Sequence, residues 1–351
     1  MKLQIKKISR ENLFKLIDSL CSEFEVIAPV KTGGDIFFNH IKNSSDITLD
    51  YINAVESPKR FFFPQIELMF KMDLNELKTL VDKEERKTRK KLIFGIRTCD
   101  LKAINGVDRF FSGERTDSYY QKLRQNTVVV NFLCNECAPE CFCTAIPGET
   151  LYCDGYDLRL SGLEDGYLIE AETEAGKEIL KKNRLLFSET EKRDFKLREE
   201  NVKILEEKIK RNNPFAKTIE NLRKGKVSSK AWENIALSCQ DCGGCCYVCP
   251  VCTCYNTIED FENELIKRYR YWDSCLFSGF SRMVHAYNPI PTPGERLKYR
   301  FMHRLKYFEE RYSSAGCTGC GRCDVVCLGD IGTGAVLMKI KNKEPKCSRS
   351  L

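Results

Sequence analysis

The chain has 351 residues, of which 42% are hydrophobic and 20 are cysteine, and its 57 Lys and Arg against 50 Asp and Glu give a formal charge of +7. This length predicts about two domains, while the lack of an 18-residue apolar run and the charged start Met1–Lys7 argue against a transmembrane helix and an ordinary secretory signal. We therefore expect a cytoplasmic protein whose clustered cysteines bind metal rather than form disulfides, with no nucleic-acid partner, because the basic and aromatic stretch Arg268–Trp272 stands alone.

The first half of the chain has the pattern of an α/β domain. Apolar residues recur with helical spacing over residues 11–21, and Cys21 continues that face as an expected buried structural thiol. Leu92–Gly95 and Thr127–Phe132 are short apolar or β-branched runs, which predict buried strands. A hairpin is predicted around the turn Glu164–Gly166.

The second half is predicted to be mostly helical. Residues 176–233 are rich in Lys and Glu with scattered leucines, which predicts exposed connecting helices that break at Asn213-Pro214. Thr257-x-x-Asp260 has the form of a capping box, so a helix is expected to start there. Another helix is predicted over residues 297–308, whose apolar residues align on one face.

Two cysteine runs in this half share one spacing. They are Cys239-x2-Cys242-x2-Cys245-x3-Cys249 and Cys317-x2-Cys320-x2-Cys323-x3-Cys327. This spacing wraps a chain around a [4Fe–4S] cluster, and in two-cluster proteins the fourth cysteine of each run binds the other run's cluster. One cluster is therefore expected on Cys239, Cys242, Cys245 and Cys327, and the other on Cys317, Cys320, Cys323 and Cys249. Zinc is the alternative, but a zinc site needs only two C-x2-C pairs.

A second group of cysteines lies upstream. Cys99 and Cys134 each follow a predicted strand, at the edge where open α/β sheets place ligands. Cys137, Cys141 and Cys143 follow Cys134 closely in the sequence. These five residues predict a site for a third cluster, and the alternatives are a cysteine-rich loop or a zinc site.

A third group consists of Cys252, Cys254 and Cys275. These residues are candidate ligands of a further metal site, and the alternative is that their thiols only pack near the clusters. Cys246 stands beside Cys245, and we interpret it as a spare thiol, although such pairs also occur in disulfide-handling iron–sulfur enzymes.

Other chemistry has little support in the sequence. The chain has only three histidines, and it lacks a phosphate-binding loop, a nucleophile elbow and a dinucleotide-binding glycine motif after a strand. No site role is predicted for Cys153 or Cys347. We therefore predict an electron carrier without catalytic residues and without flavin or NAD of its own.

Short motifs along nearly the whole chain match one known family. They are Ala28-Pro-Val30, Pro58-Lys-Arg-Phe-Phe-Phe63, Gly95-Ile-Arg-Thr-Cys-Asp-Leu101, Gly155-Tyr-Asp-Leu158, Cys249-Pro-Val-Cys-Thr-Cys254 and Trp272-Asp-Ser-Cys275. In this combination the chain resembles the β subunit of cytoplasmic NiFe sulfhydrogenases, and the iron–sulfur electron-transfer component of anaerobic sulfite reductases is similar.

The resemblance implies a function and a set of ligands. Members of this family are electron-transfer subunits of hetero-oligomers, between a flavoprotein subunit that binds NAD(P)H and a catalytic or small iron–sulfur subunit. The cysteines that match the family upstream are Cys99, Cys134, Cys141 and Cys143. Cys252, Cys254 and Cys275 also match it, whereas Cys137 and Cys246 do not.

These observations lead us to expect two domains. Residues 1–195 form a mixed α/β domain with one [4Fe–4S] cluster, and residues 196–351 form a helical connector and a ferredoxin-like, mostly helical domain with two clusters and a long helical insertion. A fourth cluster would involve the third cysteine group. Two alternatives stay open: an enzyme that reduces a disulfide or sulfur compound at an accessible cluster, and a zinc scaffold without a redox role.

Overall fold

The N-terminal part of the protein is built on a seven-stranded mixed sheet. The computed structural model describes residues 3–75, 78–80 and 89–343, and the strand order is β1-β9-β8-β7-β6-β2-β3. The strands are β1 (Gln4–Ile8), β2 (Glu25–Thr32), β3 (Asp35–His40), β6 (Lys91–Ile96), β7 (Thr127–Phe132), β8 (Leu158–Leu163) and β9 (Gly166–Ala171). The four central strands, β2, β6, β7 and β8, are parallel, whereas β3 and β9 pair with them in the antiparallel sense. The predicted strands, the hairpin and the mixed α/β class are thereby confirmed.

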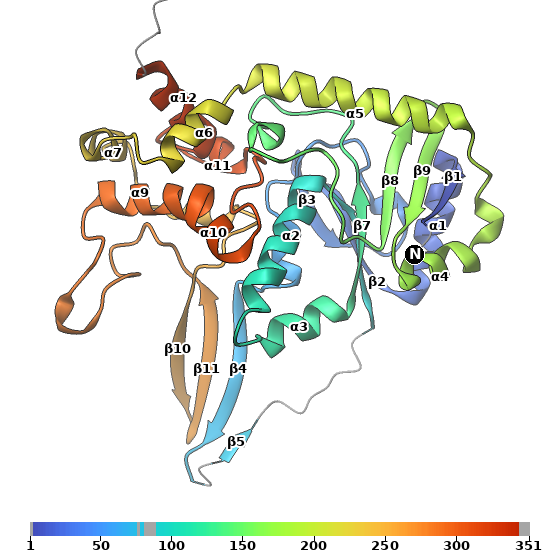
Figure 1. The fold of residues 1–351 in the computed structure, drawn as a ribbon. Coiled ribbons are helices and arrows are strands. Elements are labelled where there is room, and N and C mark those ends of the chain that lie inside the picture. The colour runs from blue at the N-terminus through green and yellow to red at the C-terminus, as the bar shows by residue number, and fades with distance from the viewer. Residues whose placement is uncertain (1–2, 76–77, 81–88, 344–351) are drawn as a thin grey trace, which may run out of the picture.

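Helices cover both faces of this sheet (Figure 1). On one face α1 (Arg10–Glu23) and α4 (Glu174–Lys182) share a core with Leu92 and Phe94 of β6. On the other face α2 (Thr98–Phe111) and α3 (Ser118–Gln125) share a core with Ile93 of the same strand. Successive side chains of a strand point to opposite faces, so a continuous apolar run fills both cores. The helix predicted over residues 11–21 is confirmed as α1, and Cys21 is half-buried against its core rather than fully buried.

The protein also has a smaller antiparallel sheet, which the sequence did not predict. Its order is β10-β11-β4-β5, formed by β4 (Ile66–Asp73), β5 (Lys78–Leu80), β10 (Tyr255–Glu262) and β11 (Leu265–Trp272). The helix expected from Thr257 is therefore wrong, and the segment between the cysteine runs is not wholly helical. Asn263 and Glu264 both have positive φ, 46° and 64°, as the central residues of a tight hairpin turn require.

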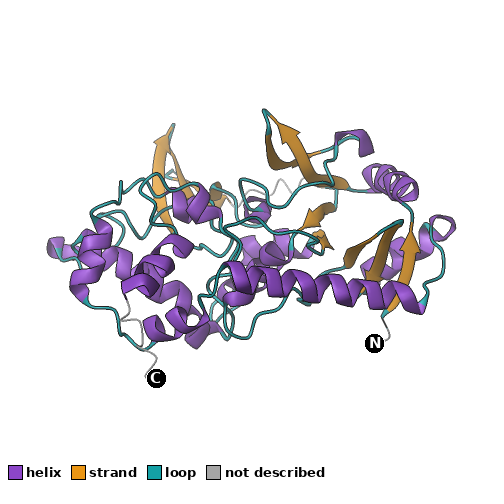
Figure 2. Cartoon of the chain, turned by 90° about the horizontal axis from the view of Figure 1, so that it is seen from above, coloured by secondary structure: helices purple, strands orange, loops and turns teal. Residues whose placement is uncertain are grey.

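Apart from β10 and β11, the described part of the C-terminal half consists of helices joined by loops, and its mostly helical character was predicted. The helices are α5 (Lys192–Asn212), α6 (Ala216–Arg223), α7 (Ser229–Ala236), α8 (Gly244–Tyr247), α9 (Pro293–Met302), α10 (Phe308–Tyr312), α11 (Arg322–Val325) and α12 (Thr333–Lys343), with a π-helical turn at His303–Tyr307. The helix predicted over residues 297–308 is confirmed, and so is the break after α5. Figure 2 shows α5 running along the sheet towards the helical part of the molecule. The expected domain boundary at residue 195 falls inside α5 and stays a prediction.

Within the described ranges, the chain forms no helix with the length and apolar character that a membrane span requires.

Candidate metal centres

The five upstream cysteines meet at the carboxyl edge of the large sheet. Cys99 lies in the first turn of α2, directly after β6, and Cys134 follows β7, its parallel neighbour. One cavity is lined by the upstream cysteines Cys99, Cys134, Cys137, Cys141 and Cys143. We call this set the strand-end group. Cys320 of the second run lines the same cavity, which places the strand-end group against the C-terminal module.

The loop that carries most of the strand-end group is held from two sides. Asn213, at the end of α5, donates from Nδ2 to the carbonyl oxygens of Pro139 (2.8 Å) and Cys141 (2.9 Å). The Phe142 N–H donates to the carbonyl of Gly319 at 2.8 Å. Gly319 has a φ of +62°, and a Cβ there would lie 2.4 Å from the Cys143 nitrogen, so only glycine permits this approach.

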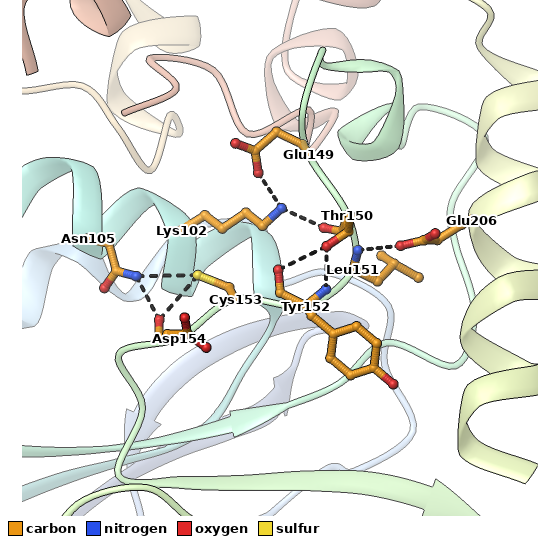
Figure 3. A network of polar contacts seen from close by, with 9 residues as sticks. All are labelled: Lys102, Asn105, Glu149, Thr150, Leu151, Tyr152, Cys153, Asp154 and Glu206. Atoms are coloured by element: carbon orange, nitrogen blue, oxygen red, sulfur yellow. Dashed lines mark hydrogen bonds and ion pairs between the residues drawn. The ribbon is translucent and has the colours of Figure 1, made fainter. Parts of the chain in front are cut away.

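A network of polar contacts joins α2, the loop of residues 149–154 and α5 beside the strand-end cavity (Figure 3). Lys102 of α2 bonds to Glu149 and to the carbonyl of Thr150, and the Leu151 N–H donates to Glu206 of α5 at 2.7 Å. Lys102, Thr150 and Leu151 line the cavity. Asn105 Nδ2 lies 3.3 Å from Cys153 Sγ, which does not line that cavity. Cys347 lies outside the described residues.

The second cysteine run surrounds another cavity together with one cysteine of the first run. Its lining includes Cys317, Cys320, Cys323 and Cys249, the set that the exchange of fourth cysteines requires. The Thr333 N–H lies 3.3 Å from Cys323 Sγ. Gly321 has a φ of +78° and immediately precedes α11, so the loop turns sharply before its short helix. We call these four cysteines the inner group.

The first run has the same local form and lies closer to the surface. Gly243, with a φ of +72°, precedes the four-residue helix α8. Cys239 and Cys245 pack against the same core as Cys327 of the other run. Burial raises the pKa of Cys239, and Cys327 is near enough to contribute to that rise. Cys242 is exposed. We call Cys239, Cys242, Cys245 and Cys327 the outer group.

Burial raises the pKa of several thiols in these groups. It raises the pKa of Cys141 to about 11 and that of Cys320 to about 12, and it raises the pKa of Cys99 well above its usual value. Metal ligands must be thiolates, so metal binding here would release protons and would be coupled to folding.

Three buried cations face the cysteine groups. Arg300, Arg304 and Lys59 are 1%, 7% and 3% exposed. In the described part of the chain no carboxylate pairs with any of them, and Nε and Nη1 of Arg300 have no hydrogen-bond partner. Arg304 donates from Nη1 to Cys249 Sγ, and Arg300 and Arg304 both line the inner-group cavity. Buried charge needs a counter-charge. Thiolate-ligated iron–sulfur clusters are anionic, so the residues present fit such clusters.

A fourth set of thiols lies beside the inner and outer groups. Cys246, Cys252 and Cys275 are buried together, and Cys245, Cys249 and Cys254 pack against them. The third group of the sequence analysis is thus joined by Cys246, which the sequence alone suggests is a spare thiol. The β10–β11 hairpin explains why Cys254 and Cys275 lie close together. It places Tyr255 opposite Trp272 and so returns Cys275 to the neighbourhood of Cys254. Among all described residues, no three donors converge on a single metal ion.

Comparison with known proteins agrees with this picture. Residues 238–331 match the family described as "4Fe-4S dicluster domain". Over 344 residues, which cover 95% of this chain and 98% of the relative, the sequence is 29% identical to the sulfhydrogenase 2 subunit beta of Pyrococcus furiosus. The resemblance seen in the sequence is confirmed: the chain is similar to a sulfhydrogenase β subunit over nearly its whole length, and residues 238–331 match the model of a dicluster iron–sulfur domain.

Proposed function

We propose that this protein is the electron-transfer subunit of a sulfhydrogenase-like redox complex. It relays electrons between a flavoprotein subunit that binds NAD(P)H and a catalytic or small iron–sulfur subunit. One observation carries the proposal: the cysteine groups are contiguous. Cys320 lines both the strand-end and the inner cavity, and Cys249 of the inner group comes from the run that supplies most of the outer group.

The same proposal assigns ligands to three [4Fe–4S] clusters. The outer group and the inner group hold one each. The third is held by Cys99, Cys134, Cys141 and Cys143 of the strand-end group, while Cys137 lines that cavity without being a ligand. Such clusters suit a relay because they take up and release single electrons with little ligand movement.

The protein's own residues offset the charge that a relay must accommodate. Arg304 donates to Cys249 Sγ, and the Thr333 N–H points at Cys323 Sγ. Hydrogen bonds and positive charge near a ligand sulfur stabilise the more negative, reduced state and therefore tune the potential. Burial of these groups keeps water from screening their effect.

A partner subunit would approach the outer group, because large apolar side chains are exposed around it. Leu237 is 84% exposed and precedes Cys239 by two residues. Val325 and Leu328, on either side of Cys327, are 74% and 93% exposed. Grouped apolar side chains on a surface mark interaction sites. Electrons would then enter or leave through the least buried group.

Anaerobic reduction tests the relay. The full-length chain with its clusters is mixed with NADPH, with and without the flavoprotein subunit of its complex, and the visible absorbance is followed. Bleaching is expected only when the flavoprotein is present, since this chain has no dinucleotide-binding motif. Flavin retained by the isolated chain, or its direct reduction by NADPH, would contradict the proposal. Three clusters hold on the order of twelve irons, and stoichiometric zinc in their place would also contradict the proposal.

The alternative is an enzyme that reduces a disulfide or sulfur compound at Cys245-Cys246 or at the third cysteine group. Cys246, Cys252 and Cys275 are 1%, 6% and 3% exposed. Substrate would have to reach sulfur atoms that the fold covers, so the relay has the better support.

A further inference from the structure

Four cysteines lie together in the interior of the protein and are not ligands of the three proposed clusters. Cys246, Cys252 and Cys275 form a buried cluster, and Cys254 packs against it. They come from three parts of the fold: α8, the loop after Cys249, and the segment that follows β11. Thiols also pack as small hydrophobic groups, so proximity alone leaves the role of this set open.

A buried cation beside the set points to a ligand. Lys59 is 3% exposed, and its Nζ donates to the carbonyl of Cys252 at 2.9 Å and lies 3.9 Å from the ring centre of Trp272. No carboxylate within the described ranges pairs with it. Burying an ammonium group without an anion is costly. Four neutral thiols would supply no counter-charge, whereas four thiolates around a metal cluster would.

We propose that Cys246, Cys252, Cys254 and Cys275 bind a fourth [4Fe–4S] cluster. The inference rests on the proposed function, since it treats the other cysteine groups as clusters. It assigns Cys246 as the ligand that completes a set of four, the number that such a cluster takes. With the site loaded, Lys59 would face an anionic cluster.

The position of the site gives it a place in the relay. Cys246 is the chain neighbour of Cys245 in the outer group, and Cys249 of the inner group packs against the same thiols. In a helical turn of 3.6 residues, neighbouring side chains point about 100° apart, so Cys245 and Cys246 serve different sites. A fourth cluster would thus lie next to both the inner and the outer group. It would give electrons a side branch off the direct path between those two groups.

Iron and sulfide analysis of the anaerobically reconstituted full-length protein tests the inference, with zinc measured in the same samples. The wild-type chain should hold on the order of sixteen irons rather than twelve. Cys275→Ser and Cys246→Ser should each lower the count by up to four and change the electron paramagnetic resonance of one cluster only. Cys153→Ser is the matched control, because Cys153 lines no cysteine cavity, and it should keep the full count.

Several results would overturn the inference. A wild-type count near twelve, a single zinc with no further iron, or an unchanged count in Cys246→Ser would each exclude the four-thiol cluster. The wild-type count decides the question even if a variant fails to fold. Reduction through the flavoprotein is measured separately on the wild-type chain. A count near sixteen without that reduction would refute the relay and keep the fourth site.

Discussion

Arg322 and Asp100 form a buried, two-pronged ion pair, with Nη1 and Nη2 at 2.7 and 2.8 Å from the two carboxylate oxygens. Arg322 stands between Cys320 and Cys323 of the inner group, and Asp100 follows Cys99 of the strand-end group. Arg322 Nε also donates to the carbonyl of Ala54 at 2.8 Å. The pair therefore fixes the position of the strand-end group relative to the inner group.

Removing one partner of this pair should destabilise the protein strongly. Asp100→Asn leaves the Arg322 charge buried and without its partner, and the loss of such a partner costs about 3–5 kcal/mol of unfolding free energy. Anaerobic thermal unfolding measures the loss. The double variant Asp100→Asn with Arg322→Met should recover part of it, because no charge then remains buried.

An exposed ion pair provides the control. Glu174 is 73% exposed and lies 2.8 Å from Lys177, so Glu174→Gln should change stability by less than about 0.5 kcal/mol. An equal loss in the Asp100 and Glu174 variants would show that the buried pair has no special role in joining the two groups.

Sequence reasoning succeeded where local pattern and topology agree. Cys99 and Cys134 were expected at strand ends, and β6 and β7 are indeed adjacent and parallel, because continuous apolar runs in this order favour a buried parallel sheet. The repeated cysteine spacing grouped Cys249 with Cys317, Cys320 and Cys323, which line one cavity, while the assignment of cluster ligands stays a prediction.

Sequence reasoning failed where pairing between strands that are far apart in the sequence determines the structure. Thr257 and Asp260 suit a helix start, yet this segment pairs with β11, which in turn pairs with β4 almost two hundred residues earlier. Tertiary pairing overrides such local signals. The only local hint was Asn263-Glu264 between alternating residues. The hairpin then brought Cys275 to Cys254, and no spacing rule could have added Cys246 to that set.

The exchange of fourth cysteines predicts a displaced effect. Cys249→Ser should alter the cluster of the second run, because Cys249 lines the cavity of Cys317, Cys320 and Cys323. Electron paramagnetic resonance of the reduced variant should show a change first in the signal of the second run's cluster. Damage confined to the cluster of Cys239, Cys242 and Cys245 would refute the exchange.

Two cysteines of the strand-end group should behave differently. Cys99→Ala should remove or convert one cluster and leave the inner and outer clusters intact, because Cys99 is fixed in the first turn of α2. Cys137→Ala should leave every cluster in place, although Cys137 lines the same cavity. Iron counts on the two variants compare them directly. If Cys137 proved essential and Cys99 dispensable, the site would be a compact loop and the strand-end argument would be wrong.

Arg304 should set the potential of the inner cluster. Its Nη1 donates to Cys249 Sγ, and it is 7% exposed. Reduction adds negative charge to the cluster, so Arg304→Gln removes more stabilisation from the reduced state than from the oxidised one, and the midpoint potential should fall. A hydrogen bond to a charged group contributes ~1.5–3 kcal/mol, and because part of that energy is also present in the oxidised state, the fall should be at most roughly 65–130 mV for one electron.

Redox titration followed by electron paramagnetic resonance measures this fall in the full-length protein. Arg311→Gln is the matched control, because Arg311 lies on the following helix with an exposed side chain, where solvent screens its charge. The midpoint potential of the inner cluster in Arg311→Gln should stay close to that of the wild type. A rise in the Arg304 variant, or equal shifts in both variants, would mean that the buried guanidinium does not act on the cluster through Cys249.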